Sequence, residues 1–398
     1  MKKYHFGVTR TPMILSRIIL FLSLCLCVSA VQIPAQDFKI VADGIEYAEV
    51  TREISGLKVN MNLLRLDLTK VRLDVVHAMD AAIGTEKTSS IATRHGAFAA
   101  INAGFFRLDT TIWAGDAAGA LTIGGRRISE STNNRVALFI FNQTDATSTY
   151  IAPLETRDQI QIKKWDLIIS GINRERKADE LVMFTPEFHR TTLTDNTGLE
   201  IIVRKDKVTE VRDRAGSSLI PTDGYVLSAS GSMREKLLPL NMKGAKVYKI
   251  VTLVIRNEGH ELTEENRKIL AAHNEAEDIV AGVPQLIKDG KIDITWEQEK
   301  TTKSFVETRH PRTAVAKLKD GKFLMITVDG RSESSGGISL YDLGAYLLEL
   351  GATDATNLDG GGSTTMFVGG KVANHPSDKE GERKVSDAIL VTLRRKGH

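Results

Sequence analysis

The segment best suited to chemistry is a run of three glycines set between polar residues. Positions 357–366 read Asn-Leu-Asp-Gly-Gly-Gly-Ser-Thr-Thr-Met. Consecutive glycines lose much backbone entropy on folding, so they are expected where the chain turns sharply or approaches a ligand closely. Amides in such a bend can form an anion-binding nest, and Asp359 places a carboxylate at its entrance. The segment predicts a binding loop, with a glycine-rich hairpin turn as the alternative.

The spacing of this segment excludes two common phosphate-binding motifs. No lysine follows the glycines, as it would in a Walker loop. The pattern also does not open a helix after a strand, as a dinucleotide-binding fingerprint does. We therefore expect an anion to be bound by a loop of another kind, through Gly360, Gly361, Gly362, Ser363 and Thr364.

A second candidate is Asn102, which ends an apolar strand and precedes a turn of small residues within Ala100–Phe106. Its side-chain amide can both donate and accept, which suits a sugar hydroxyl or a phosphate oxygen. The alternative is a turn asparagine that bonds its own backbone.

Two further segments bring charges to strand ends. Arg312, within Arg309–Ala316, presents a planar donor fork that matches phosphate. It could equally pair with a surface carboxylate such as Glu307. Asp329 and Arg331 follow a buried strand, a place where site residues often lie. Asp-Gly is, however, also an ordinary turn pair.

These residues must be positioned by a strand-rich framework. Apolar residues alternate with polar ones from Leu57 to Val76, as in a half-buried hairpin. The chain also offers compact apolar runs that predict strands, one of them buried. These runs are Val136–Phe141, Leu199–Val203, Lys322–Val328 and Thr365–Val368.

Helices are expected at few places. Thr263–Ala276 begins with an N-cap threonine, Ser339–Leu350 has leucines at helical spacing and stops at Gly351, and Ser89–His95 could form a short helix. Strands mixed with a few helices favour an α+β fold with a strand-rich sheet core. The less regular stretch 144–257 could be a lobe inserted into that fold.

The first 30 residues have the layout of a secretory signal peptide. Four basic residues and no acidic one precede or flank a short apolar run, and small residues follow at Val28-Ser29-Ala30. We expect cleavage here, export to the periplasm or cell exterior, and no stable membrane span afterwards. The alternative is an uncleaved N-terminal anchor.

Charge and cysteine usage narrow the classes of function. The predicted signal holds four of the 53 basic residues and none of the 50 acidic ones, so 49 basic residues remain against 50. A general nucleic-acid-binding surface is therefore not expected. Both cysteines, Cys25 and Cys27, lie in the signal. A mature chain without cysteine has no disulfide, thiolate nucleophile or Cys-ligated zinc.

Taken together, the four segments resemble the phosphodiester glycosidase family. They read NAGFF, RTAVA, VDGR and NLDGGGSTTM, in the order that the family shows. The resemblance covers roughly Ala92–Val391 and is strongest over 282–391. One departure is Ala103, where the family often has glycine. The resemblance implies a single large catalytic domain over 37–398.

The resemblance also implies hydrolysis of the glycosidic C–O bond of a sugar-1-phosphodiester. Asp359 and Asp329 are then the candidate catalytic carboxylates. Asn102 and Asn357 would hold sugar hydroxyls or the phosphate. The leaving phosphate would be neutralised by loop amides and by arginines, namely Arg312, Arg331 and Arg383.

The expected partner is a sugar phosphate or a phosphopolymer. No cofactor is required by these residues, although Asp359 or Asp329 could hold a divalent cation. Two rival functions use the same residues: a non-catalytic cell-envelope protein that binds glycans or phosphopolymers, and a phosphatase or phosphodiesterase that cuts P–O. The second rival normally needs a metal cluster or a strong nucleophile.

Overall fold

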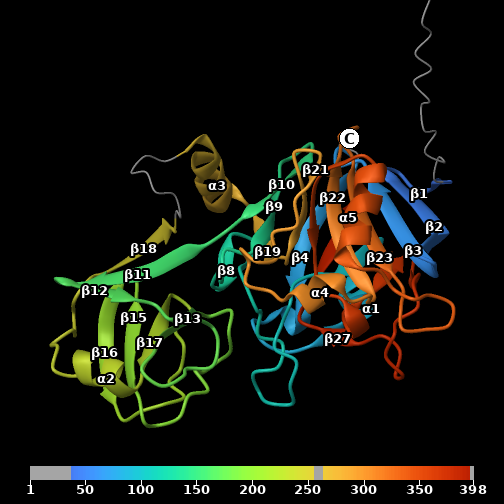
Figure 1. The fold of residues 1–398 in the computed structure, drawn as a ribbon. Coiled ribbons are helices and arrows are strands. Elements are labelled where there is room, and N and C mark those ends of the chain that lie inside the picture. Colours follow the sequence, from blue (N-terminus) through green and yellow to red (C-terminus); the bar gives the residue numbers. More distant parts are fainter. Residues whose placement is uncertain (1–36, 255–262, 395–398) are drawn as a thin grey trace, which may run out of the picture. The chain divides into compact units, whose positions relative to one another are not determined.

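The computed structural model describes residues 37–254 and 263–394. The predicted signal peptide, residues 1–30, lies outside the described residues. Within them, the largest sheet has the strand order β1-β2-β3-β23-β22-β24-β20-β21, and all its neighbours run antiparallel (Figure 1). The bounds are Lys39–Ala42 (β1), Ile45–Ile54 (β2), Leu57–Leu66 (β3), Gln285–Lys288 (β20), Lys291–Ile292 (β21), Arg312–Leu318 (β22), Phe323–Val328 (β23) and Ala352–Asn357 (β24).

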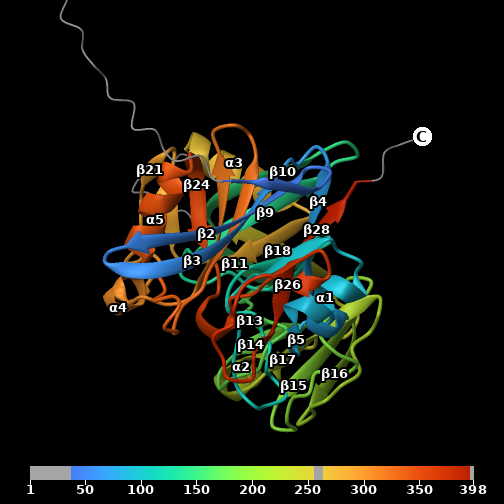
Figure 2. The ribbon, with the colours of Figure 1, turned by 90° about the vertical axis from the view of Figure 1, so that its right-hand side faces the viewer.

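Two five-stranded sheets complete the part of the fold that surrounds the site. One has the order β26-β25-β6-β28-β4, and β28 lies beside β4 (Figure 2). Its bounds are Val71–His77 (β4), Ala99–Asn102 (β6), Met366–Val368 (β25), Lys371–Val372 (β26) and Asp387–Leu393 (β28). The other has the order β10-β9-β19-β7-β8, with bounds Leu121–Ile123 (β7), Arg126–Ser129 (β8), Val136–Asn142 (β9), Thr147–Pro153 (β10) and Asp278–Ala281 (β19).

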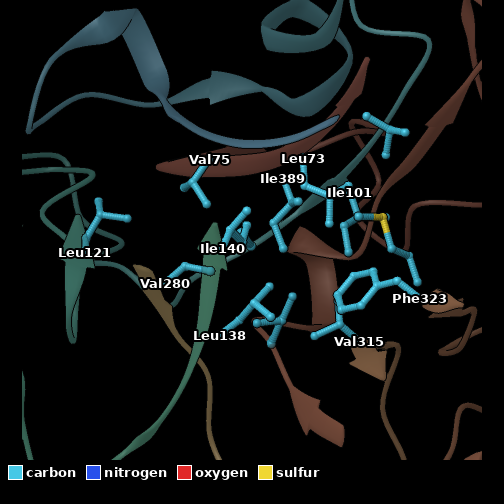
Figure 3. Packing of buried hydrophobic residues seen from close by; sticks show 14 of the residues in the cluster. Leu73, Val75, Ile101, Leu121, Leu138, Ile140, Val280, Val315, Phe323 and Ile389 are labelled. Atoms are coloured by element: carbon cyan, nitrogen blue, oxygen red, sulfur yellow. The ribbon is translucent and has the colours of Figure 1, made fainter. Parts of the chain in front are cut away.

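These three sheets share one hydrophobic core. Figure 3 shows Phe323 of the eight-stranded sheet, Ile101 and Ile389 of the second sheet, and Leu138 and Ile140 of the third gathered together. All five side chains are fully buried. Burial of apolar area contributes about 25 cal/mol per Å², so this shared core holds the sheet ends that carry the site in a rigid arrangement.

Residues 156–253 form two further sheets around a hydrophobic cluster of their own, which includes Ile160, Leu181 and Ile201. The strand orders are β12-β11-β18 and β13-β14-β17-β15-β16. Their bounds are Thr156–Ile162 (β11), Trp165–Ile168 (β12), Gly171–Ile172 (β13), Leu181–Phe184 (β14), Leu199–Arg204 (β15), Lys207–Asp213 (β16), Gly224–Ala229 (β17) and Val247–Leu253 (β18). The division of the chain into domains stays a prediction.

Helices are short in the described residues, and no helix there is both long and apolar enough to cross a membrane. Helix α5 lies against the eight-stranded sheet (Figure 1), and its residues Leu343 and Leu347 belong to one hydrophobic cluster with residues of that sheet. The bounds are Thr88–Arg94 (α1), Gly231–Leu237 (α2), Glu264–Glu275 (α3), Lys303–Glu307 (α4) and Leu340–Glu349 (α5), with 3-10 turns at Ala78–Asp80 and Gly361–Ser363 and a short strand pair Glu86–Lys87 (β5) and Lys384–Val385 (β27).

The α+β, strand-rich fold predicted from the sequence is confirmed. The predicted helix starts are also confirmed, because the side chains of Thr263 and Ser339 accept N-cap hydrogen bonds from Asn266 and Asp342. Gly351 ends α5 with φ +89°, as a C-terminal glycine is expected to do.

The predicted hairpin from Leu57 to Val76 is wrong. Both halves are strands with alternating burial, but β3 pairs with β2 and β23 whereas β4 pairs with β28. The turn between them passes the chain from one sheet to another. Alternation of apolar and polar residues indicates that one face of a strand is buried. It does not indicate which strand is its neighbour in the sheet.

We predict that Ser339→Ala lowers the free energy of unfolding by about 1 kcal/mol, because the Asp342 amide at the start of α5 loses its acceptor. Denaturant titration measures this change. Ser339→Thr keeps a hydroxyl acceptor and is the matched control. An alanine variant as stable as the wild type would show that this cap contributes nothing.

Candidate active site

The antiparallel register brings the predicted segments to one edge of the eight-stranded sheet. Arg312, the first residue of β22, lies opposite Val328, the last residue of β23. Asn357, the last residue of β24, lies opposite Ala314 of β22. Asp329 and the glycine loop, defined as residues 359–364, therefore leave the sheet at the same edge, where Arg312 enters it.

The glycine loop is packed so closely that side chains would not fit at its first and third glycines. A β-carbon at Gly360 would lie 2.8 Å from the Pro311 carbonyl oxygen. One at Gly362 would collide with the guanidinium of Arg383 and the carboxylate of Asp378. Gly361 has φ +62°, a conformation that favours glycine. Close approach of backbone, and not a simple turn, explains the three glycines.

Protein groups already use several amides of this loop. The Gly360 N–H donates to the Asp359 carboxylate (2.9 Å), the Gly361 N–H to the Pro311 carbonyl (2.9 Å) and the Ser363 N–H to the Gly360 carbonyl (3.2 Å). The wide anion-binding nest that we expected from Gly360, Gly361 and Ser363 is thus largely occupied by internal hydrogen bonds. A bound anion needs other donors.

The carboxyl group of Asp359 is held inside the loop. Burial raises its pKa to about 6, while the Ser363 hydroxyl, the Gly360 amide and the Arg383 charge act in the opposite direction. Asp387 raises the Asp359 pKa further. A carboxyl with this pKa changes its charge just below neutral pH, which is the range that acid–base or nucleophilic catalysis uses.

Asp329 is the second candidate carboxylate, and it is buried with 3% of its surface exposed. It accepts hydrogen bonds from the His375 backbone N–H (3.0 Å) and the Asn374 side chain (3.4 Å). The His375 ring lies 3.3 Å from the other carboxylate oxygen. Burial raises the pKa of Asp329, and the contacts with His375 and Asn374 oppose that shift.

Asn374 links the two carboxylate regions. Its side-chain nitrogen donates to the Thr364 carbonyl (3.0 Å) as well as to Asp329, and its oxygen accepts from the Met366 amide (2.7 Å). Sequence reasoning did not select Asn374 or His375, because neither stands in a motif. Only the fold places them against Asp329.

Asn102 connects β6 to the glycine loop and to β22. Its side-chain nitrogen donates to the Asp359 carbonyl (2.7 Å), and its oxygen accepts from the Thr313 hydroxyl (2.8 Å) and the Thr365 amide (3.0 Å). With 1% of its surface exposed, Asn102 acts on the loop, and its oxygen has no capacity left for a sugar hydroxyl.

Asn357 is also buried, and protein groups use only part of the hydrogen-bonding capacity of its side chain. Its side-chain nitrogen donates to the Val283 carbonyl (2.7 Å). Its oxygen, together with the hydroxyls of Thr364 and Thr365, is buried without a hydrogen-bond partner among the described residues. Buried polar groups are normally paired, so three such atoms beside one loop mark a place where a polar ligand or water completes the structure.

The arginines of the site differ in how free they are. Arg383 is held by a two-point ion pair with Asp378 (2.7 and 3.0 Å). Arg312 donates to the carbonyls of Phe305 (2.7 Å) and Thr308 (2.8 Å) and lies over the Phe305 ring. Both side chains are therefore occupied by protein, which was not expected of phosphate ligands.

Arg331 is the exposed arginine of the site. A β-carbon on Gly361 would lie 3.0 Å from its guanidinium, and its backbone has φ +59°, a strained conformation for arginine. Its side-chain contact is the His310 ring at 3.5 Å. Among the predicted cations, Arg331 has the donors best placed to receive an anion.

Positive charge is concentrated here without a matching carboxylate. Burial, and then the charge of Arg331, lower the pKa of Arg312 to about 10. Burial and both arginines also lower the pKa of His310. Within residues 37–254 and 263–394, the partners of Arg312 and Arg331 are carbonyls and rings and not acids. A buried uncompensated cation is costly, and an anionic ligand would relieve that cost.

The side chains of the site can also be considered as ligands of a metal ion. In the part of the chain that the structure describes, no three His, Cys, Asp or Glu side chains come together closely enough to hold one. Asp359 and Asp329 could each supply one oxygen. Whether a divalent cation joins them stays an open expectation.

Asp359, Asp329, Arg312 and Arg331 thus meet at one edge of the eight-stranded sheet, an arrangement that could bind an anion. Residues 197–392 match the family model described as phosphodiester glycosidase. The resemblance that the motifs predicted is therefore confirmed for this part of the chain, which includes every predicted site residue except Asn102.

Relatives share only part of their length with this chain. It is 40% identical over 107 residues to the SPbeta prophage-derived uncharacterized protein YomE of Bacillus subtilis, covering 27% of this chain and 16% of that protein. It is 36% identical over 126 residues to the N-acetylglucosamine-1-phosphodiester alpha-N-acetylglucosaminidase of Bos taurus, covering 29% and 23%. Both matches span under a quarter of the relative.

A solved structure shows the same fold. A hypothetical protein from Synechocystis matches with a TM-score of 0.74 and 23% identity, covering 91% of this chain and 64% of that chain. At this identity the likeness supports the arrangement of sheets and says nothing of the reaction.

We predict that Asn102→Ala lowers the free energy of unfolding by about 2–3 kcal/mol, because the Thr365 amide and the Asp359 carbonyl lose a buried partner. Chemical denaturation measures the loss. The half-buried Asn60, whose side chain makes a solvent-exposed hydrogen bond to the Ser334 carbonyl, provides the control as Asn60→Ala, with a loss of about 1 kcal/mol or less. Equal losses for the two variants would refute the role given to Asn102.

Proposed function

We propose that this protein hydrolyses the glycosidic C–O bond of a sugar-1-phosphodiester, releasing the free sugar and a phosphomonoester. The observation that carries this proposal is that the Asp359 carboxyl belongs to a glycine loop which also contacts Arg312 at Gly360 and Arg331 at Gly361. The Asp359 carboxylate can stabilise an anomeric carbon that becomes positive, and the two arginines can stabilise a phosphate that leaves with negative charge. The family match and the printed activity of the bovine relative support the same reaction class.

Asp359 is the group that would face the anomeric carbon. With a pKa of about 6, it is mostly ionised at pH 7. Glycosidic cleavage passes through an oxocarbenium-like state, which a carboxylate stabilises by charge, by direct attack or by taking a proton from water. Asp329 is held by Asn374 and His375 and would fill the second carboxylate role.

The leaving group needs little protonation, because a phosphate diester oxygen is already a weak base. It needs positive charge and oriented donors. Arg331 supplies free donors beside Gly361, and the unpartnered hydroxyls belong to Thr364, the last residue of the loop, and to Thr365, which follows it. Arg312 adds charge from behind, since its own N–H groups are used by carbonyls.

The bond changes balance without a further reactant. Water supplies an oxygen to the anomeric carbon, the C–O bond to phosphate breaks, and its electron pair leaves with the phosphate. One water proton stays on the new sugar hydroxyl, and the other leaves through a carboxylate. We propose that this reaction takes place outside the cytoplasm, on the strength of the signal-like first 30 residues.

The alternative is a non-catalytic cell-envelope protein that binds a glycan or phosphopolymer in the same site. The uncompensated arginines would serve binding equally well. The raised pKa of Asp359 favours catalysis over binding alone, because a carboxylate that only binds hydroxyls gains nothing from a shift toward neutral pH.

Hydrolysis in oxygen-18 water tests the bond that breaks. We expect the label in the anomeric hydroxyl of the released sugar, measured by mass spectrometry. Asp359→Asn should reduce turnover about 10³-fold or more while a substrate still binds, as measured by calorimetry. Label in the phosphate would reject C–O cleavage, and full turnover by the Asp359 variant would reject the catalytic role of that carboxyl.

We also expect Arg331→Ala to lower kcat/KM for a sugar-1-phosphodiester about 10²-fold, because the anion loses its free guanidinium. Arg331→Lys should recover part of that loss, since a point charge remains without the planar fork. Arg212→Ala is the control: Arg212 is exposed and pairs with Glu210. Equal activity of the Arg331 and Arg212 variants would contradict phosphate binding by Arg331.

A further inference from the structure

A third carboxylate lies behind the site, in β28. Asp387 is buried with 1% of its surface exposed. One carboxylate oxygen accepts a 2.5 Å hydrogen bond from the Gly104 amide, and the other accepts from the Ser386 hydroxyl (2.5 Å). None of the roles proposed for the site involves this carboxyl. A buried acid nevertheless destabilises the fold unless it is paired.

The counter-charge for Asp387 comes from the neighbouring strand. His77 of β4 lies directly opposite Asp387 in the antiparallel register and is also buried. Its two ring nitrogens lie 3.1 and 3.0 Å from the carbonyl oxygens of Ala78 and Gly115. Each ring nitrogen therefore faces a backbone hydrogen-bond acceptor.

Asp387 is connected to Asp359 through the turn that follows β6. The Ala103 amide donates to the Asp387 backbone carbonyl (3.1 Å), and the Ala103 carbonyl accepts from the Asp359 amide (2.9 Å). The carboxylate of Asp387 takes the next amide, that of Gly104. A β-carbon on Gly104 would lie 3.2 Å from that carboxylate, so the turn and the acid are closely fitted.

We propose that Asp387, which lies opposite His77 in the strand register, is a positioning residue for the reaction, which holds the turn 102–104 and keeps a fixed negative charge near Asp359. The inference rests on the proposed function and adds a residue to it. Asp387 does not contact substrate in this account. It acts through the turn and through its charge.

The charges around these groups favour such a role. The nearby cation of Arg383 lowers the pKa of Asp359, and the nearby anion of Asp387 raises it. Burial raises the pKa of Asp387 itself, whereas His77, Ser386 and the Gly104 amide favour its ionised form. At low dielectric a like charge nearby disfavours ionisation, so Asp387 keeps the Asp359 carboxyl closer to neutral pH.

The variant Asp387→Asn removes the charge of this side chain and keeps its shape. The asparagine oxygen can still accept from Gly104, and its amide can donate to Ser386, so the turn stays while the charge is lost. We expect the titration midpoint of Asp359 to move to lower pH. Carbon-13 NMR of labelled aspartates measures this without substrate, with Asp359→Asn identifying the signal.

Kinetics give the second readout. In the wild type, kcat/KM should fall as pH drops below about 6, because Asp359 becomes protonated. In Asp387→Asn this acidic limb should move to lower pH. Asp387→Ala loses the turn as well, and its kcat/KM should fall about 10²-fold, as for a misplaced catalytic group. The exposed Asp166, replaced by asparagine, controls for loss of one acid.

An unchanged Asp359 midpoint in Asp387→Asn would overturn the proposal. Should that variant fail to fold, the wild-type spectrum decides: Asp387 must give a carboxylate signal at pH 7, and a protonated Asp387 would contradict the fixed negative charge that the proposal gives it. Because the NMR titration needs no turnover, an inactive wild type would reject the proposed function while leaving this coupling to be judged separately.

Discussion

The site depends on one steric constraint, the contact of the glycine loop with the Pro311 carbonyl and the Asp378–Arg383 ion pair. No side chain fits at Gly360 or Gly362 without displacing these neighbours. The backbone can therefore bring Asp359 to the sheet edge where Arg312 begins and Asp329 follows β23. The shared core of three sheets keeps that edge in place.

The charges of the site indicate what kind of substrate it could accept. Asp359 and Asp329 are acids whose burial raises their pKa, and Arg312 and Arg331 are cations that interact with carbonyls and rings. Among the residues that the structure describes, no ion pair joins these two acids to these two cations. Charged groups without ion-pair partners lower the stability of the fold. Their presence is explained if a substrate supplies both an electron-poor carbon and an anion.

Local signals predicted the elements well. The caps at Thr263 and Ser339 and the stop at Gly351 depend on neighbours in sequence, so the pattern was sufficient. The buried strand β23 was evident from its apolar run. The hairpin from Leu57 to Val76 failed, because the choice of partner strand depends on residues more than 250 positions away.

The site itself could be predicted only in outline. The motifs named the right segments, but the partners of Asn102 stand 211 to 263 positions away in the chain. Nothing in the sequence indicates that its oxygen is used by protein, or that α4 supplies carbonyls to Arg312. Asn374 and His375 stand outside the motifs, and only three-dimensional packing reveals them.

The most direct test of the central claim is a crystal structure with a non-hydrolysable sugar-1-phosphonate ester. Our account predicts the phosphonate against the Arg331 guanidinium and the Thr364 hydroxyl, with the anomeric carbon facing the Asp359 carboxylate. A ligand bound elsewhere, or one seated with its sugar on Arg331 and its phosphonate away from the glycine loop, would contradict it.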